Sequence, residues 1–187
     1  IRTSIEALLT GINGKYRDTS EAPNAKDYDR YREMSAVELT EVFRSFHSTL
    51  LNSVVLSVDN KPTSLYISEI YVAPKGYTKV PRASTIKLSG SIPTDVIYLQ
   101  WYYPSRFGEQ AVRVRQINEN AGQYHWSPYQ WIRDDRPTDP FLLTDVFAQP
   151  SLFSVMKTYV YHGALHIIPM GSDHILFILG LFFLQSD

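Results

Sequence analysis

The sequence predicts a mainly β protein: a β-sandwich-like domain with a short helical pair, followed by a C-terminal transmembrane helix that starts a helical membrane domain. Six runs with strand character recur at intervals of roughly 8–12 residues, which is typical of a β-sandwich. Helical spacing precedes these runs, at about 27–51. The third observation is the run ILFILGLFFL at 175–184, which contains no polar side chain.

The composition excludes several classes of protein. The 187 residues are 44% hydrophobic and 20% charged, which suits one domain with a small appendage. A net charge of -1 provides no basic field, so we expect no nucleic-acid partner. The absence of cysteine excludes a disulfide scaffold, a zinc ribbon and a thiol nucleophile. We expect no enzyme, because the sequence has no Gly-rich phosphate loop, nucleophile elbow or suitable carboxylate pair.

Two helices are predicted near 27–51. The charged stretch Asp27–Met34 has aromatic and arginine side chains three and four residues apart. Ser35 is followed three residues later by Glu38, which is the capping-box pattern of a helix N-terminus. Apolar side chains then recur at helical spacing, so the second helix is predicted from Ala36 to Leu51.

Strand signals follow these helices. The apolar period changes from near 3.6 to 2, and turn residues separate the runs. The predicted strands are 54–58, 65–72, 84–89, 95–103, 112–115 and 124–132. In the fourth run, one face is expected to point into the core and carries Ile97, Leu99, Trp101 and Tyr103.

The charged, proline-containing stretch at 133–140 ends the strand region. The sequence therefore predicts a β-sandwich-like domain at 1–140, a linker at 141–150 and an amphipathic to transmembrane helical segment at 151–187. We expect this last segment to be incomplete and to continue beyond Asp187.

The apolar tail leaves three interpretations open. Ten apolar residues are too few to cross a bilayer, which takes roughly 20. Extended back to Ala164, the tail has 21 residues but includes two histidines, an aspartate and a proline. We favour the interpretation that it is the first span of a membrane protein. The alternatives are an interfacial anchor and a buried helix of a soluble protein.

Metal-ligating side chains gather within thirteen positions at the start of this tail: His162, His166, Asp173 and His174. On a continuous helix, the first three would lie within roughly 40° of one another. Imidazole and carboxylate ligands suit Ni, Co, Zn, Cu or Fe. Pro169 and Gly171 are expected to break or kink the helix, and interrupted membrane helices can line ion sites. The alternative is that these side chains are interfacial residues of a membrane anchor.

The same segment carries a longer motif: a Gly, two variable residues, His-Ile, then Pro, Gly, Asp-His, Leu-Phe and a Leu/Phe-rich run. The residues that fill it are Gly163, His166, Ile167, Pro169, Gly171, Asp173, His174, Leu176 and Phe177. In this motif the chain closely resembles the first transmembrane segment of the HupE/UreJ family. A weaker likeness to members with an extracytoplasmic domain lies upstream, at Trp101, Tyr103, Pro104, Gly108, Arg113 and Arg115.

This resemblance implies a bacterial inner-membrane protein whose N-terminal domain lies on the periplasmic side. Its partners would be the lipid membrane and other membrane subunits or further copies of itself. The family is similar to permeases for nickel or cobalt, so the resemblance implies that a divalent transition metal, Ni or Co, is the transported ion. His166, Asp173 and His174 would be ligands or relay groups, with His162 as a helper outside the family pattern.

One departure concerns the spacing: six residues separate His166 from Asp173, where the nickel permeases have five. A second interpretation therefore stays open, in which the chain is an accessory or anchoring subunit of a larger membrane complex. Its soluble domain would then bind a partner, without transport.

Aromatic residues are the other notable feature, at Tyr98, Tyr102, Tyr124, Trp126, Tyr129 and Trp131. On one exposed face they would form a stacking platform for a sugar or a peptide. The alternative, which we favour from sequence alone, is that most of them fill the core or its rim. His47 and His125 are expected to be ordinary surface or core residues.

Overall fold

The computed structural model describes residues 1–12, 16, 18–118, 122–144, 146, 147, 153, 156, 157 and 159–161. The chain divides into two compact units, Ile1–Phe147 and Ala148–Asp187. In the second unit the described residues, Phe153 among them, are helical. Across the described residues, no helix combines the length and the apolar character that a bilayer crossing requires.

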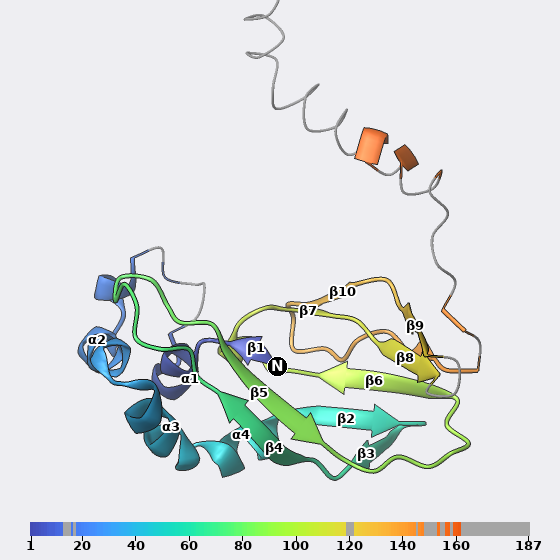
Figure 1. Cartoon of the computed structure of the whole chain (residues 1–187), viewed down its shortest axis with the longest axis horizontal. Helices are drawn as coiled ribbons and strands as arrows, with labels where there is room; N and C mark the ends of the chain where they lie inside the picture. The colour runs from blue at the N-terminus through green and yellow to red at the C-terminus, as the bar shows by residue number, and fades with distance from the viewer. Residues whose placement is uncertain are drawn as a thin grey trace, which may run out of the picture. The chain divides into compact units, whose positions relative to one another are not determined.

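The first unit is mainly β with a few helices, as predicted. Its α-helices gather at one end, and the hairpin of β8 (Arg115–Asn118) and β9 (Gln123–Trp126) lies at the other (Figure 1). The described strands are β1 (Arg2–Thr3), β2 (Val55–Val58), β3 (Lys61–Thr63), β4 (Tyr66–Tyr71), β5 (Ser84–Ser89), β6 (Tyr98–Tyr102), β7 (Gln110–Val112), β8 (Arg115–Asn118), β9 (Gln123–Trp126), β10 (Gln130–Ile132) and β11 (Phe141–Leu142).

These strands form four antiparallel sheets. The largest has the order β11-β6-β2-β3 and the next has the order β1-β5-β4, while β10 pairs with β7 and β8 pairs with β9. The hydrophobic core includes Ile86 from β5, Ile132 from β10 and Tyr103, which follows β6. The predicted strand 84–89 is confirmed residue for residue.

The predicted strand 95–103 is too long, and Ile97, the first residue of its predicted core face, does not reach the core. Asp59, in the turn after β2, accepts hydrogen bonds from the backbone N–H groups of Ile97 and Tyr98 at 3.1 and 3.0 Å. The strand therefore begins only at Tyr98, and the Ile97 side chain is 53% exposed. Tyr103, at the other end of the predicted face, is fully buried.

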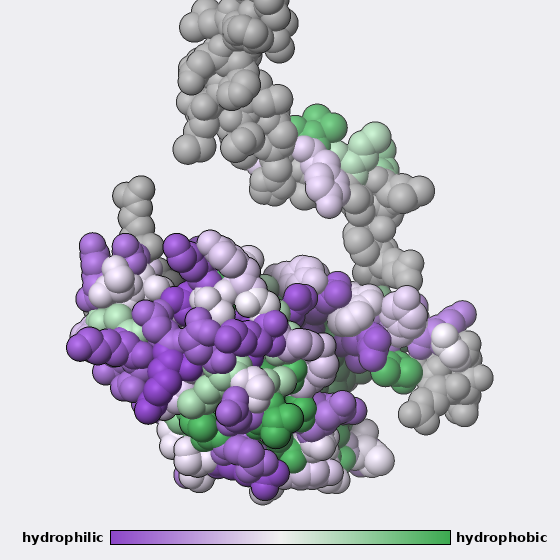
Figure 2. All heavy atoms as spheres, turned by 60° about the vertical axis from the view of Figure 1, so that its left-hand side comes forward, coloured by the Kyte–Doolittle hydropathy of each residue, from purple (hydrophilic) through white to green (hydrophobic). Residues whose placement is uncertain are grey.

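The helices of the first unit are α1 (Ile5–Thr10), η1 (Thr19–Glu21), α2 (Ala25–Glu33), α3 (Ala36–Arg44), α4 (His47–Ser53) and η2 (Ser105–Phe107). The predicted capping box is confirmed, since the Ser35 side chain accepts from the Glu38 backbone N–H and the Glu38 carboxylate accepts from the Ser35 N–H. Exposed ion pairs such as Arg30–Asp27 lie on α2, and Figure 2 shows that the helix-bearing side is largely hydrophilic.

The single helix predicted from Ala36 to Leu51 is wrong, because α3 and α4 are separate. The backbone N–H of Phe46 bonds to the carbonyl of Phe43, three residues back, at 2.9 Å. This tight turn redirects the chain and sets the Phe46 ring against Phe107, with 5.7 Å between the ring centroids. Buried side chains on both helices, Leu39 and Leu50, still face the same core.

A buried ion pair between Glu6 and Arg82 connects the helices to the strand region. Glu6 on α1 is fully buried, and its carboxylate accepts a hydrogen bond from Arg82 Nε at 2.7 Å. The other two guanidinium nitrogens donate to the carbonyls of Met34 and Tyr31, each at 2.8 Å. Each guanidinium nitrogen of Arg82 therefore donates a hydrogen bond. These bonds connect the segment before β5 to α1 and to the end of α2.

Candidate functional site

The metal ligands expected from the sequence are His166, Asp173 and His174, with His162 as helper, and all four lie outside the described residues. Among the residues that are described, no group of three or more His, Asp or Glu side chains is close enough to hold a metal ion. The site expected at the head of the apolar tail therefore stays a prediction.

His47 in α4 and His125 in β9 are the other two histidines. The His47 ring packs edge-on against Phe43, with 5.1 Å between the centroids, and burial lowers its pKa. Its Nε2 atom and the Nδ1 atom of His125 are buried without a hydrogen-bond partner. Both rings are packed among the side chains of the first unit.

The first unit holds a different candidate site, built on an interrupted hairpin. One arm of the hairpin is β7 followed by β8, and the other is β9 followed by β10. In the β7–β10 ladder, Val112 pairs with Gln130, whereas in the β8–β9 ladder Arg115 pairs with Trp126. The register therefore shifts by one residue between the two ladders.

The arm formed by β9 and β10 has one residue more than the opposing arm between the two ladders, in the segment that contains Ser127 and Pro128. Proline has no N–H to give to a ladder, so it is found at bulges and edges of sheets. Ser127 makes two hydrogen bonds to Val114 across the hairpin. Its N–H donates to the Val114 carbonyl at 2.8 Å, and its hydroxyl accepts from the Val114 N–H at 2.8 Å. The hairpin thus contains a β-bulge held by one buried serine.

This bulge decides which side chains share a face. In an uninterrupted strand, Trp126 and Tyr129 would point to opposite faces, because side chains alternate. The added residue brings both onto the face that carries Arg113 and Arg115 of the opposing arm. We call the resulting surface the aromatic–arginine face; its members are Arg113, Arg115, Tyr124, Trp126, Tyr129 and Trp131.

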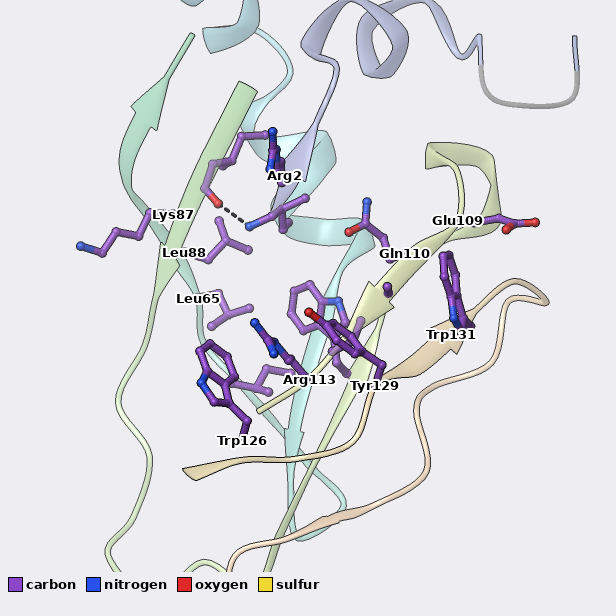
Figure 3. A pocket seen from close by; sticks show the side chains of 16 residues that line it. Arg2, Leu65, Lys87, Leu88, Glu109, Gln110, Arg113, Trp126, Tyr129 and Trp131 are labelled. Carbon is purple, nitrogen blue, oxygen red and sulfur yellow. Dashed lines mark hydrogen bonds between the residues drawn. The ribbon is translucent and has the colours of Figure 1, made fainter. Parts of the chain in front are cut away.

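Arginines and aromatic rings contact one another along this face. The Arg113 guanidinium lies 3.6 Å from the centroid of the Trp126 ring and 4.6 Å from that of Tyr129, and Figure 3 shows it between the two. Arg115 lies 5.2 Å from the Trp126 centroid and 5.9 Å from that of Tyr124. Such cation–π contacts are worth about 0.5–1 kcal/mol each at exposed sites.

A groove of about 900 Å³ runs beside the face. Its lining includes Leu65 and Leu88 on the side of β4 and β5, and Arg113, Trp126 and Tyr129 on the side of the hairpin (Figure 3). Further apolar side chains of the lining are Leu56, Ile86, Trp101 and Val112, and its charged side chains include Arg2, Lys87 and Glu109.

The arginines beside the groove differ in their partners. Arg133, placed over the Trp131 ring at 5.0 Å, forms an ion pair with Glu109 at 3.3 Å. Arg113 is exposed and, within the described part of the chain, makes no hydrogen bond and no ion pair. Its position is fixed by the two rings while its donors face the groove.

The aromatic platform considered from the sequence is therefore present in part. Tyr124, Tyr129 and Trp131 are 54%, 58% and 61% exposed, so these three rings do not fill the core, whereas Trp126 is half-buried. Tyr98 and Tyr102, on β6, are half-buried. The signal that could have found the shared face is the Ser-Pro pair inside the predicted strand 124–132, which marks a bulge.

A comparison with protein families finds a match in the C-terminal part of the chain. Residues 144–187 match the family model described as HupE / UreJ protein. The match confirms the resemblance drawn from the sequence motif, and it is consistent with a HupE/UreJ family protein. No curated protein and no solved structure matches the chain.

The matched segment contains every predicted metal ligand. Members of this family are membrane proteins, and the family indicates transport or handling of a transition metal in general. The aromatic–arginine face lies outside the match, in the first unit.

Proposed function

We propose that this chain is part of a HupE/UreJ-type inner-membrane protein that transports or handles a divalent transition metal, nickel or cobalt. His166, Asp173 and His174 are the proposed ligands or relay groups, with His162 as helper. The first unit is the proposed periplasmic domain, β-sandwich-like in architecture. The observation that carries the proposal is the family match over 144–187, which includes the whole His…Asp-His motif.

Physical chemistry supports the placement of these side chains. An aspartate at the centre of a bilayer costs roughly 2.5–3.5 kcal/mol on insertion scales, so intramembrane carboxylates face a cavity, an ion or a partner. Imidazole nitrogen and carboxylate oxygen are suitable ligands for Ni and Co. Pro169 and Gly171 lie between the proposed ligands, and a helix interrupted there exposes carbonyl groups that can also face an ion.

The experiment compares metal accumulation in cells that produce the full-length protein or its variants. Total nickel and cobalt per cell are measured by mass spectrometry after growth with each metal. We expect accumulation to fall to the empty-vector level in His166→Ala and Asp173→Ala. The matched control is His125→Gln, in the first unit, which should accumulate metal as the wild type does. Accumulation at the wild-type level in all three variants would contradict the proposal that His166 and Asp173 are ligands.

The second candidate is the accessory or anchoring role. The groove in the first unit favours it, because Arg113 lines the groove and forms no hydrogen bond or ion pair with any described residue. In that case a stoichiometric partner co-purifies with the full-length protein. Metal content would then be indifferent to His166→Ala and Asp173→Ala.

A further inference from the structure

We propose that the groove beside the aromatic–arginine face binds an extended peptide segment of a partner protein, with an acidic side chain of that segment on the Arg113 guanidinium. This inference goes beyond the proposed metal handling and does not depend on it. It rests on three features: the free donors of Arg113, the strand edges along the groove, and the composition of its walls.

Arg113 has the properties of an anion-binding group. A guanidinium presents its N–H donors in a rigid plane that matches the two oxygens of a carboxylate. The rings of Trp126 and Tyr129 hold the Arg113 guanidinium at 3.6 and 4.6 Å without using those donors. Little side-chain freedom is therefore lost when a carboxylate binds.

The contrast with neighbouring cations supports an anionic ligand at this residue. Arg133 already has Glu109 at 3.3 Å, and Lys87 has Glu69 at 3.7 Å. Glu109 is the one acidic side chain among the groove-lining residues, and it belongs to the Arg133 pair. Of the described cations that line the groove, Arg2 and Arg113 form no ion pair, and Arg113 is the one held between two aromatic rings. An acidic partner side chain would complement its charge.

Strand edges explain why the ligand is an extended peptide. Consecutive residues line the groove on both sides, 86–88 from β5 and 109–113 at β7. Because side chains alternate along a strand, consecutive lining residues mean that backbone as well as side chains borders the groove. β5 is paired with β1 on one side and β4 on the other, so the strand edge that a ligand could use is that of β7. Among the described residues β7 pairs with β10 alone, so its other edge has no strand partner. Main-chain groups on such an edge bind a peptide added as a further strand.

The walls have the composition of a protein interface. Trp, Tyr and Arg are the residue types enriched at binding hot spots, and Trp126, Tyr129 and Arg113 meet here. The apolar wall opposite, with Leu65 and Leu88, would cover alternate side chains of the bound strand. A nucleic acid is the less suitable occupant, because the chain has a net charge of -1 and offers few unpaired cations along the groove for a phosphate backbone.

The test is a selection on the full-length protein in detergent with a phage-displayed library of random heptapeptides. The consensus peptide is then synthesised with a fluorophore, and its affinity is measured by anisotropy. We expect an acidic residue at a fixed position of the consensus. Replacing that residue by its amide should weaken binding about tenfold or more, as expected when a hydrogen-bonded charge is lost.

Protein variants locate the binding. Arg113→Met should lose about tenfold or more in affinity for the consensus peptide, and Arg113→Lys, which keeps the charge but not the planar fork, should lose less. Arg113 is exposed, so unchanged far-UV circular dichroism is expected for both variants. The matched control is Arg30→Met on α2, an arginine that also lies over a ring, that of Tyr31 at 5.0 Å, and it should bind as the wild type does.

Three results would overturn the proposal. The first is a selection that enriches no peptide above the background of detergent alone. The second is a consensus peptide whose affinity is the same for Arg113→Met as for the wild type. The third is binding of a ten-nucleotide thymidine oligomer, lost in Arg113→Met, by a protein that selects no peptide, which would assign the face to a nucleic acid.

Discussion

The first unit and the segment matched by the HupE/UreJ family differ in the functional side chains that they contain. In the first unit, arginines lie on aromatic rings, and its described residues bring no three metal-ligating side chains together. From His162 to Asp187 the chain has no Lys or Arg, yet it contains three of the five histidines. This difference predicts that the proposed recognition of a partner and the proposed handling of a metal are separable, so each region should respond to its own substitutions.

A second contrast lies within the first unit, between two arginines. Arg82 is buried and every one of its guanidinium nitrogens donates to Glu6 or to a backbone carbonyl. Arg113 is exposed, lies between two rings and has no such partner among the described residues. The first arginine stabilises the fold, whereas the second is available to a ligand.

The largest expected effect comes from Arg82→Met. The change leaves the Glu6 carboxylate buried and unpaired, which costs about 3–5 kcal/mol of unfolding free energy. Thermal and urea unfolding of the full-length protein, followed by near-UV circular dichroism, measures the loss. Metal bound per folded chain should not change, because the proposed metal ligands lie in the other region.

Lys87→Met is the matched control for that prediction. Lys87 and Glu69 are both exposed and 3.7 Å apart, so their pair contributes less than about 1 kcal/mol. Equal losses in Arg82→Met and Lys87→Met would contradict the role given to the buried pair.

Alkaline pH provides the next largest effect. Burial raises the pKa of Tyr103 to about 12, so its neutral form is favoured in the folded state. Stability from this group is fully present below the ordinary tyrosine pKa of about 10 and falls as pH rises through about 12, by up to about 2.7 kcal/mol. Tyr103→Phe should flatten the pH dependence of urea unfolding over that range.

Tyr66→Phe is the control, since this side chain on β4 is exposed and its loss should leave the alkaline slope unchanged. Burial also raises the pKa of Tyr28, so a smaller slope is expected to persist in Tyr103→Phe. A slope as steep as that of the wild type would contradict the assignment to Tyr103.

The smallest effect is expected at the α3 capping box. Ser35→Ala removes the side-chain acceptor for the Glu38 N–H, at a cost of about 1 kcal/mol. Ser91→Ala, in the exposed connection between β5 and β6, should leave the unfolding midpoint unchanged. If both variants unfold at the same midpoint as the wild type, the capping box does not contribute measurably to stability.

The sequence predicts those features whose cause is local. The capping box at Ser35 and the strand 84–89 follow from neighbouring residue types, and both are confirmed. The break at Phe46 was missed because it depends on packing against Phe107, far along the chain. The shared face of the hairpin was missed because a register shift of one residue at Pro128 reverses which rings lie together.

The candidate sites likewise differ in whether their residues are close together in the sequence or only in the fold. The His…Asp-His motif is contiguous enough to be found from sequence, and the family match includes it. Arg113, in contrast, becomes a candidate only when the fold places Trp126 and Tyr129 on either side of it and no described residue forms an ion pair with it.

The most direct test is calorimetric titration of the purified full-length protein with Ni²⁺, comparing the wild type with Asp173→Asn and Arg113→Met. We expect the wild type and Arg113→Met to bind the metal with the same affinity. Asp173→Asn should bind it at least about tenfold more weakly, since even changes next to a metal ligand cost that much. Wild-type affinity in Asp173→Asn would contradict the assignment of metal handling to this segment.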